Sequence, residues 1–324
     1  MSPTVSVVMS AYNSSAHIRQ SVQSVLDQTF RDFEFVIVND GSMDDTPTIL
    51  DEFASRDERV RIIHQENTGL TQALVTGCAQ ARGEFIARQD DDDWSHPKRF
   101  ARQLGFLETH PTVGFLGCAT RYVGPQGEPL ELVTRSADPV IASRELAEKR
   151  FGPPAHGGVM FRRDIYEKAG GYRPEFYLGQ DSDLWLRMIE VAQFACIPEE
   201  SYYFRRHAAS VSSRHRDMQH TFGLLSHACR VARSENRSEQ EFLDEAKRVA
   251  RLVRSARASG NQHGEDLELN YLIGSRLVKT GSIEARRYLW PVVLNRPWHW
   301  RAWTRIVQSY LTGRRQAAEE SVRE

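Results

Sequence analysis

The chain has 324 residues, enough for one large domain or two smaller ones with a core that needs no disulfide. Its 42 basic and 43 acidic residues leave a formal net charge of −1, which argues against a general binder of nucleic acid. The four cysteines form no CxxC pair, a spacing typical of buried thiols in a reducing cytosol rather than of a zinc site or a secreted disulfide framework.

The amino terminus shows no signal-peptide pattern, and no apolar run is long enough to predict a membrane-spanning helix. We therefore expect a cytoplasmic protein, and contact with the inner face of a membrane stays open. The charge divides unevenly, with 22 basic and 30 acidic residues (net −8) in 1–213 and 20 basic and 13 acidic residues (net +7) in 214–324. This asymmetry predicts two regions with those boundaries.

Strand-like apolar runs alternate with helix-period segments in the first region. Strands are expected at residues 5–9, 33–38, 60–63 and 85–87, and a helical pattern follows each of them. Repeated strand–helix units predict an α/β fold with a mainly parallel open sheet flanked by helices. Ligands bind such sheets beyond the carboxyl ends of the strands, so we look for functional residues there.

The strand signal fades after residue 213. Residues 239–257, 267–278 and 283–294 have the pattern of amphipathic helices, and the breaks between them fall near glycine or proline. The second region is therefore predicted to be a helical appendage at the carboxyl terminus.

The first two strands end in residues that suit a nucleotide pocket. Ala11, Tyr12 and Asn13 end the first strand, and Asp40 ends the second. An aromatic ring and a carboxylate at adjacent strand ends can stack on a base and accept its ring N–H. The alternative, a turn at Asp40 followed by a helix cap, stays open.

The fourth strand runs into four aspartates, Asp90, Asp91, Asp92 and Asp93. Adjacent carboxylates repel one another unless they are solvated or neutralised, and a hard divalent cation such as Mg²⁺ or Mn²⁺ is a usual neutraliser. The alternative is an exposed acidic loop. The run directly follows a buried strand, at the sheet edge where ligands bind, so we favour the metal site.

A third acidic element begins a predicted helix. In the sequence GQDSDLWLRM at residues 179–188, Asp181 lies in the first turn, where the helix dipole favours an ionised carboxylate that can act as a general base. A simple helix cap is the alternative. The glycine-rich nucleotide motifs GxGxxG and GxxxxGK[ST] and the hydrolase motif GxSxG are absent from the sequence.

Taken in order, residues 6–46, 66–103 and 179–188 resemble a family-2 glycosyltransferase of the GT-A fold, and the resemblance spans roughly residues 4–213. It implies an inverting transfer of a hexosyl or N-acetylhexosaminyl group from a nucleoside-diphosphate sugar, UDP-linked, to a hydroxyl. The implied acceptor is a glycan or a lipid-linked glycan in bacterial-type surface polysaccharide assembly. Mn²⁺ or Mg²⁺ is the implied cofactor.

The resemblance also implies roles for single residues on the donor side. Ala11, Tyr12, Asn13 and Asp40 would hold the nucleotide base, Asp90 the ribose, and Asp92 the metal that bridges the diphosphate. Asp91, counted with the nucleotide-binding residues, departs from the small residue that the family usually has there.

Further roles follow on the acceptor and diphosphate sides. Asp181 would be the catalytic base, with Gln180 in place of the family's glutamate and His156 as a second acceptor-side candidate. Residues 203–207 and 210–213 resemble a loop that closes on the diphosphate, and its candidate contacts are Arg205, Arg206 and Ser212.

Two other function classes stay open from the residues alone. A nucleotidyltransferase shares an open sheet with an acidic metal site but normally has a glycine- and lysine-rich loop after its first strand, which is missing here. A catalytically degenerate glycan-binding module is the non-enzymatic alternative, and the intact acidic residues argue against it. The sugar and the linkage depend on variable segments such as residues 122–132.

The tail has an unusual concentration of tryptophan. Four of the six tryptophans, Trp290, Trp298, Trp300 and Trp303, lie within 14 residues and alternate with arginines. Such a mixture suits the headgroup region of an anionic membrane. Packing of the rings within the tail, on the first region or in a homodimer is the alternative, and we favour packing at this stage.

Overall fold

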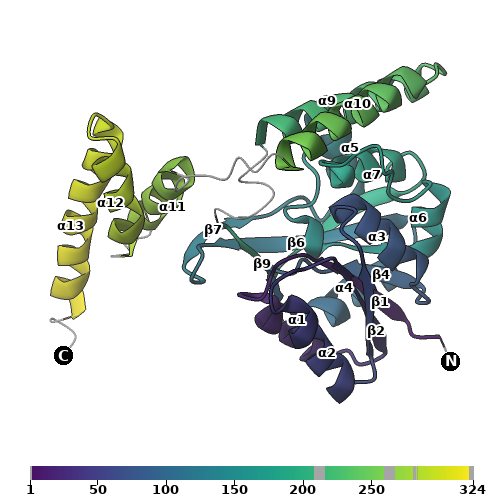
Figure 1. Ribbon diagram of the computed structural model, residues 1–324, viewed down its shortest axis with the longest axis horizontal. Coiled ribbons are helices and arrows are strands. Elements are labelled where there is room, and N and C mark those ends of the chain that lie inside the picture. The colour runs from purple at the N-terminus through teal and green to yellow at the C-terminus, as the bar shows by residue number, and fades with distance from the viewer. Residues whose placement is uncertain (1, 208–215, 259–266, 280–281, 283, 321–324) are drawn as a thin grey trace. The chain divides into compact units, whose positions relative to one another are not determined.

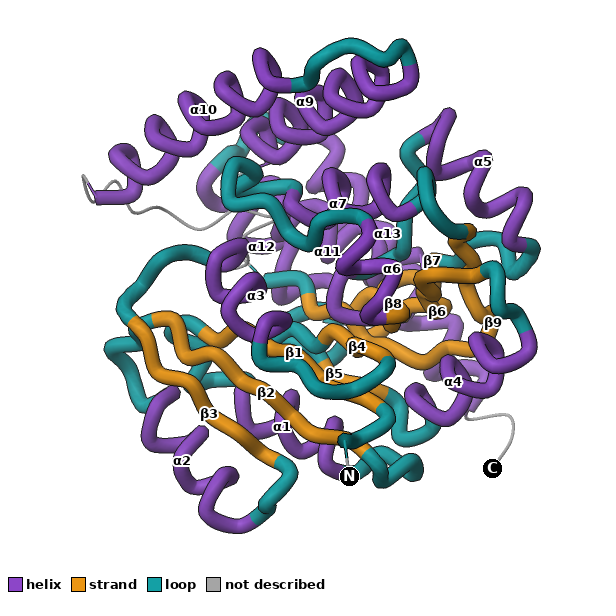
Figure 2. Tube along the Cα trace, turned by 90° about the vertical axis from the view of Figure 1, so that its right-hand side faces the viewer, coloured by secondary structure: helices purple, strands orange, loops and turns teal. Residues whose placement is uncertain are grey.

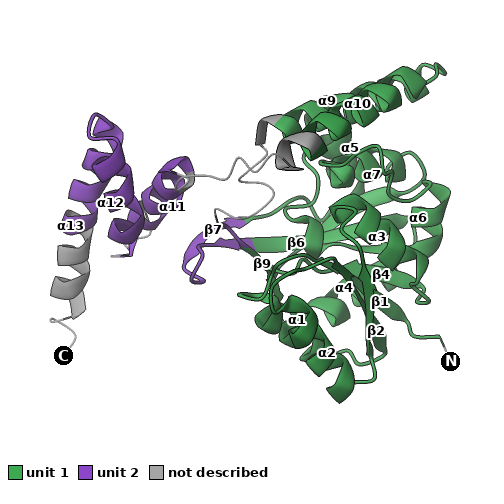
Figure 3. Cartoon of the chain, viewed as in Figure 1, with its two compact units in different colours: residues 1–120, 133–204, 216–259 green, residues 121–132, 205–215, 260–324 purple. Residues whose placement is uncertain are grey.

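The computed structural model describes residues 2–207, 216–258, 267–279, 282 and 284–320 (Figure 1). The chain forms two compact units, coloured separately in Figure 3. The first comprises residues 1–120, 133–204 and 216–259, and the second comprises residues 121–132, 205–215 and 260–324.

The first unit begins with the alternating strands and helices that the sequence predicts. These elements are β1 (Val5–Ala11), α1 (Ile18–Leu26), β2 (Phe33–Asp40), α2 (Thr46–Arg56), β3 (Val60–Gln65), α3 (Leu70–Ala79) and β4 (Phe85–Arg88). Strand β1 pairs in parallel with both β2 and β4, and β2 pairs in parallel with β3. The register sets Ala11 opposite Asn39, so the carboxyl ends of β1 and β2 lie side by side.

The rest of the sheet is antiparallel where its pairing is described, in contrast to the mainly parallel sheet expected from the sequence. The remaining strands are β5 (Trp94–Ser95), β6 (Val113–Val123), β7 (Pro129–Val133), β8 (Met160–Arg162) and β9 (Gln193–Arg205). Strand β8 pairs antiparallel with β4 and with β6, and β5 pairs antiparallel with β9. The sheet order among the described strands is β3-β2-β1-β4-β8-β6-β9-β5, with β7 beside β6.

Helices cover both faces of this sheet, as Figure 2 shows for α1 and α2 against α3. Side chains alternate along the strands, so Val7 and Met9 of β1 belong to one hydrophobic core and Val8 to the other. The first core is completed by α1, α2 and α4 (Arg99–Thr109). The second is completed by α3, α5 (Pro139–Lys149), α6 (Arg163–Lys168) and α7 (Gln180–Met188).

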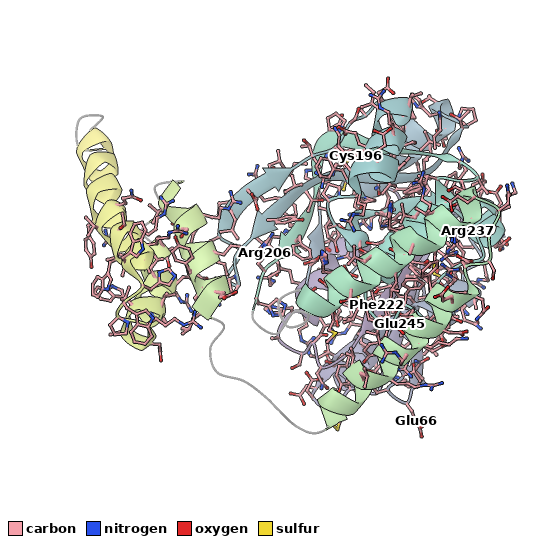
Figure 4. All side chains as sticks on the ribbon, turned by 90° about the horizontal axis from the view of Figure 1, so that it is seen from above. Glu66, Cys196, Arg206, Phe222, Arg237 and Glu245 are labelled. Carbon is pink, nitrogen blue, oxygen red and sulfur yellow. The ribbon has the colours of Figure 1, made fainter. Side chains whose placement is uncertain are left out.

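Two longer helices, α9 (Arg216–Ser234) and α10 (Gln240–Ala258), also belong to the first unit. Figure 4 labels Phe222 on α9, and this fully buried ring packs toward the residues that precede α7. Partly buried ion pairs reinforce the contact, since Arg173 binds both Asp183 of α7 and Glu239, whose carboxylate also pairs with Arg233 of α9. The start of α7 is therefore held by charges as well as by apolar packing.

The second unit has a small hydrophobic core of its own. Leu130 of β7 packs with α11 (Leu267–Lys279), α12 (Ala285–Asn295) and α13 (Trp300–Glu320). The Tyr288 hydroxyl donates to Glu128 Oε1 at 2.6 Å, and Arg276 pairs with Glu131 at 3.2 Å. The segment 122–132, expected from the sequence to be a variable loop, thus carries β7 and contacts these helices.

The three helices expected in this part of the chain are confirmed, with boundaries shifted by at most two residues. Residues 239–257, 267–278 and 283–294 were expected, and α10, α11 and α12 are observed. In the described ranges, no helix is both long enough and apolar enough to cross a membrane.

The prediction of buried thiols is confirmed for all four cysteines, Cys78, Cys118, Cys196 and Cys229, which are also free of disulfides. Burial raises the pKa of the Cys78 and Cys229 thiols to about 11 and the pKa of the Cys118 and Cys196 thiols to about 12. The thiolate is the reactive form of cysteine, so these side chains are chemically inert near neutral pH.

Glu34 of β2 gives the first unit a specific sensitivity to acid. Burial raises the pKa of this carboxyl, but hydrogen bonds from Arg82, Ser6 and Arg61 outweigh burial and lower the pKa to about 2. The unfolded chain therefore binds the proton first as the pH falls. The stabilisation from Glu34 should be complete above about pH 4.5 and lost toward pH 2, amounting to roughly 3 kcal/mol.

Urea unfolding at a series of pH values tests this expectation with the variant Glu34→Gln. The free energy of unfolding should fall less steeply below pH 4.5 in Glu34→Gln than in the parent. Glu84→Gln, which changes an exposed glutamate, is the matched control and should follow the parent. Superimposable profiles for the parent and Glu34→Gln would contradict the expectation.

Candidate active site

The loops after β1 and β2 are joined to each other. Tyr12 follows β1 with 45% of its surface exposed, and Asn13 adopts a left-handed backbone with φ of 51°. The Asn13 N–H donates to Ser42 Oγ at 3.0 Å, and Asn13 Oδ1 accepts from the Met43 N–H at 2.8 Å. The Tyr12 ring is therefore presented on an ordered surface beside the end of β2.

Asp40, the last residue of β2, is fully engaged with the segment before α3. Its Oδ1 accepts from Gln65 Nε2 at 2.8 Å and from both the N–H and the hydroxyl of Thr68, and its Oδ2 accepts from the Gly69 N–H at 2.8 Å. Gly69 has φ of +92°, and a Cβ there would meet the Tyr177 ring at 2.5 Å. Only glycine fits this position, so the bond to Asp40 depends on it.

Two of the four aspartates after β4, Asp90 and Asp91, are held by different partners. Asp90 Oδ1 pairs with the buried Arg88 guanidinium at 2.8 Å, and the Asp90 N–H donates to the Tyr202 hydroxyl at 3.2 Å. Asp91 Oδ2 accepts from the Tyr12 N–H at 3.1 Å and from the Ser14 hydroxyl. The bonds to Asp91 bring the acidic run against the loop after β1.

The acidic run carries more negative charge than its surroundings neutralise. Burial raises the pKa of Asp91 to about 7, and the charge of Asp92 adds to this, although bonds from Ser14 and Tyr12 oppose it. Burial also raises the pKa of Asp90; the Arg88 charge opposes this, whereas the charges of Asp92 and Asp181 add to it. The negative charge of Asp181 is thus one of the causes that raise the pKa of Asp90.

Asp181 lies in the first turn of α7. The segment before this helix is tied to α3, because the Thr71 hydroxyl donates to the Phe176 carbonyl at 2.7 Å. Asp181 Oδ1 accepts from the Ser182 N–H at 2.8 Å, and burial raises the pKa of the carboxyl. The side chain remains partly exposed, so a substrate hydroxyl can reach it.

His156 connects the acceptor side to the acidic run. Its Nε2 lies 2.6 Å from the Tyr172 hydroxyl and accepts from Arg88 Nε at 3.4 Å, while the other end of Arg88 binds Asp90. A guanidinium can only donate, so Nε2 is an acceptor and the ring proton resides on Nδ1. No group in the described part of the chain accepts from Nδ1, which leaves this N–H available to a ligand.

His156 is expected to remain neutral over the whole range in which ordinary histidines titrate. Burial, and then the positive charge of Arg88, lower the pKa of His156 well below its usual value of 6.5. In an NMR titration, its ring C–H resonances should not shift between about pH 5.5 and pH 8. The variant His156→Gln identifies the resonances, and a midpoint near pH 6.5 would contradict the expectation.

The short helix η1 (His156–Gly158) packs directly against the backbone at Asp90, the first residue of the acidic run. A Cβ at Gly157 would meet the Asp90 nitrogen at 2.9 Å and overlap the Tyr202 hydroxyl. The buried Arg99 guanidinium holds this contact by donating to the Gly157 carbonyl at 2.6 Å and to the Arg88 carbonyl at 2.8 Å. His156 and Asp90 are thus fixed with respect to each other.

The remaining predicted site residues lie in two places. Gln180 is the first residue of α7 and is buried. Arg205 is the last residue of β9 rather than part of a loop, and it donates to the Pro125 carbonyl at 2.7 Å. Arg206, labelled in Figure 4, follows it and lies over the Tyr122 ring at 4.6 Å. Ser212 and residues 210–213 lie outside the described residues.

Several residues of the site were not among the candidates predicted from the sequence. Ser14, Arg88, Arg99, Tyr172 and Tyr202 all bind or position the carboxylates or His156. Arg88 had a usable signal, since a charged residue ending an otherwise apolar strand two positions before Asp90 needs a partner. The two tyrosines gave no such signal because their partners are distant in the sequence.

The acidic run fits a divalent cation that is shared with a substrate. Its ligands would be carboxylate oxygens, which Mg²⁺ and Mn²⁺ prefer, and the mutual repulsion of Asp90, Asp91 and Asp92 would be relieved by a cation. Within the described residues, no three His, Cys, Asp or Glu side chains are grouped to hold a metal by themselves. A cation held by one or two carboxylates and completed by phosphate oxygens matches this arrangement.

The family of the chain follows from its sequence. The profile of the family described as Glycosyl transferase family 2 matches residues 6–170, slightly more than half of the 324 residues. The chain belongs to glycosyl transferase family 2. The matched segment contains the ends of β1, β2 and β4 and the helix η1 described above.

Two curated relatives illustrate the membership of this glycosyltransferase. It is 30% identical over 215 residues to the uncharacterized glycosyltransferase EpsJ of Bacillus subtilis, a match covering 64% of the chain and 62% of that relative. It is 30% identical over 217 residues to chondroitin synthase of Escherichia coli, covering 67% of the chain and 31% of that relative. The chain therefore spans less than two thirds of the length of both relatives.

Solved structures confirm the fold of the glycosyltransferase. Residues 1–349 of Staphylococcus aureus TarS, in complex with UDP-GlcNAc, superpose with a TM-score of 0.59 at 18% identity, covering 96% of the chain and 89% of TarS 1–349. The mannosyltransferase PcManGT from Pyrobaculum calidifontis, in complex with GDP-Man and Mn²⁺, gives 0.54 at 19% identity, covering 96% and 87%. The expected GT-A-type fold with carboxyl-terminal helices is therefore confirmed.

Proposed function

We propose that this glycosyltransferase moves a hexosyl or N-acetylhexosaminyl group from a UDP-linked donor to a hydroxyl, with inversion at the anomeric carbon. The acceptor is a glycan or a lipid-linked glycan of bacterial-type surface polysaccharide assembly. The observation that carries the proposal is the partly exposed Asp181 carboxylate, whose pKa is raised and whose charge acts on Asp90 of the acidic run. In this proposal Asp181 would be the base, and the acidic run would hold the diphosphate.

The donor would lie along the carboxyl ends of β1, β2 and β4. Ala11, Tyr12 and Asn13 would contact the base, with Tyr12 supplying the exposed ring. Asp40 would contribute to the base pocket through the segment that its carboxylate holds by bonds from the Thr68 and Gly69 N–H groups. Asp90 and Asp91 would face the ribose.

The metal proposal rests on Asp92. This aspartate would hold Mn²⁺ or Mg²⁺ together with the donor diphosphate, and the bound cation would supply charge stabilisation for the departing nucleoside diphosphate. Arg88 keeps Asp90 oriented beside it. Arg205, Arg206 and Ser212 remain candidates for further contacts with the diphosphate.

The acceptor would be activated by Asp181. An acceptor hydroxyl must lose its proton as it attacks, and a carboxylate with a raised pKa is better suited to take that proton than an ordinary aspartate. His156 Nδ1–H and the buried Gln180 are candidates for orienting the acceptor. A single base on the face opposite the leaving group leads to inversion, because no second carboxylate forms a covalent intermediate.

The name of one relative and the ligands of two structural neighbours support the proposed substrate class. A relative is named chondroitin synthase, and structural neighbours were solved with UDP-GlcNAc and with GDP-Man and Mn²⁺. Family membership also favours sugar transfer over the nucleotidyltransferase and the non-enzymatic binding module.

The test is a panel of UDP- and GDP-linked sugars with Mn²⁺ and with oligosaccharide and lipid-linked acceptors, read out as release of nucleoside diphosphate. We expect release with UDP-linked sugars and an acceptor, and a product whose anomeric configuration by NMR is opposite to that of the donor. A product with retained configuration would overturn the mechanism. Release from GDP-linked sugars alone would overturn the donor assignment.

A further inference from the structure

Helices α12 and α13 carry an exposed apolar surface that the activity does not use. We call it the aromatic surface, and its members are 37% to 78% exposed: Trp290, Leu294, Trp298, Trp300, Trp303, Val307 and Tyr310. The tryptophans among them lie outside the hydrophobic core of the second unit. Contiguous exposed apolar side chains of this size mark an interaction surface.

Each of the two helices has two apolar stripes. On α13, Ala302 and Ile306 are buried in the core of the second unit, whereas Trp300, Trp303 and Val307 are exposed along the opposite side. On α12, Leu289 and Val292 are buried, whereas Trp290 and Leu294 are exposed. The buried stripe of each helix forms the core of the second unit. The exposed stripe does not contribute to that core, so its apolar character needs another explanation.

One contact between rings joins the two helices of the aromatic surface. Trp290 and Trp303 meet edge to face with ring centroids 6.0 Å apart, which joins the exposed stripes of α12 and α13. Trp303 Nε1–H donates to the Pro297 carbonyl at 2.9 Å, and the Arg301 guanidinium lies 5.4 Å from the Trp300 ring centroid. Trp290, Trp300 and Trp303 therefore each have a contact within the second unit.

The charge of this segment has one sign. Residues 285–318 contain seven arginines and neither aspartate nor glutamate. Arg287, Arg296 and Arg301 are exposed beside the aromatic surface. Indole rings favour the boundary between headgroups and acyl chains, and each basic residue near an anionic lipid surface adds attraction.

We propose that the aromatic surface binds an anionic lipid membrane, with the tryptophans inserted at headgroup depth and the arginines on lipid phosphates. The proposal is independent of the donor and acceptor assigned above, because it concerns only the second unit.

A second copy of the chain is a poorer occupant. A two-fold interface would bring the same arginines of both copies together, and residues 285–318 offer no carboxylate to pair with them. Anionic headgroups supply the missing charge. Self-association is therefore an outcome of the test that would count against the proposal.

Flotation with vesicles tests the proposal on the full-length protein. We expect binding to phosphatidylcholine vesicles that contain phosphatidylglycerol, little binding to phosphatidylcholine alone, and weakening as salt is added. The double variant Trp298→Ser/Trp300→Ser should lower the partition coefficient more than about tenfold, since it removes the two most exposed rings. Arg296→Gln/Arg301→Gln should lower it roughly 10- to 30-fold.

Matched controls lie in the first unit. Leu224→Ser removes an exposed apolar side chain of α9 that is 51% exposed, and Arg144→Gln removes an exposed charge of α5. Both should bind vesicles like the parent, and circular dichroism should show that every variant is folded. A shift of tryptophan fluorescence to shorter wavelength with anionic vesicles should be reduced in Trp298→Ser/Trp300→Ser.

Three results would overturn the proposal. The parent could fail to float with anionic vesicles at low salt, or the tryptophan variant could bind them as well as the parent. Light scattering could also show a dimer that the tryptophan substitutions dissociate, with no vesicle binding, which would make this surface an interface between copies. Donor cleavage by the same samples, measured without vesicles, separates these results from failure of the proposed function.

Discussion

Asp181→Asn is expected to lower turnover by roughly 10²–10⁴-fold, the range for loss of a general base, while donor affinity hardly changes. Asparagine keeps the size of the side chain and an oxygen that can accept from the Ser182 N–H. It cannot accept a proton from the acceptor hydroxyl. The measurements are steady-state kinetics with saturating acceptor and calorimetry with UDP and Mn²⁺.

Asp164→Asn is the matched control, because Asp164 is also an aspartate in the first turn of a helix but is exposed and paired with Lys168. It should retain the parent's turnover. If Asp181→Asn stayed within about threefold of the parent, the base would have to be another group. The pH profile is a second readout, since its acidic limb should reflect the raised pKa of Asp181 and disappear in the variant.

Asp92→Asn is expected to abolish the metal-dependent part of donor binding. Replacing a residue that only hydrogen-bonds a metal ligand typically lowers metal affinity roughly 10–100-fold. Replacing a direct metal ligand should lower it more. Removing one negative charge also lessens the repulsion that raises the pKa of Asp91. Thermal unfolding of the variant and the parent shows whether lost affinity reflects unfolding.

Calorimetry with UDP, with and without Mn²⁺, measures the effect. In the parent, the chelator EDTA should weaken UDP binding, whereas in Asp92→Asn it should change nothing further. Asp164→Asn again serves as the control and should respond to EDTA like the parent. Equal Mn²⁺-dependent affinity in Asp92→Asn and the parent would move the metal ligand to a different residue.

Local sequence patterns predicted the first half of the fold well. Strands β1 to β4 and the helices between them bury apolar side chains at regular spacing, and this spacing is visible without any knowledge of distant contacts. The antiparallel strands were missed for a physical reason. Strand β8 has three residues and β5 has two, too few to show a period, and their pairing depends on residues far away in the chain.

The candidate site was predicted at the level of strand ends but not of partners. The parallel arrangement alone requires that Ala11, Asp40 and Asp90 approach one edge. What each side chain binds is decided by loops, as when Asp40 receives donors from Thr68 and Gly69, 28 and 29 residues away. Such contacts have no periodicity, so a single sequence does not reveal them.

In the carboxyl-terminal helices, the sequence predicted the elements but not which of their sides is buried. The helices were predicted from periodicity, but the burial of the tryptophans could not be, because α12 and α13 each carry apolar residues on two sides. Hydrophobicity along the chain does not say which of two apolar stripes meets the core. The answer came from packing, where smaller residues such as Ala302 and Ile306 fill the interior.

The inert cysteines give the protein a practical property. Since all four thiols are buried with raised pKa values, maleimide reagents should leave the parent unmodified, and no cysteine needs to be replaced before labelling. A cysteine introduced at an exposed position, for example Trp298→Cys, would be the sole attachment point for a fluorophore. Distances and depths reported by such a dye could then be assigned to one known residue.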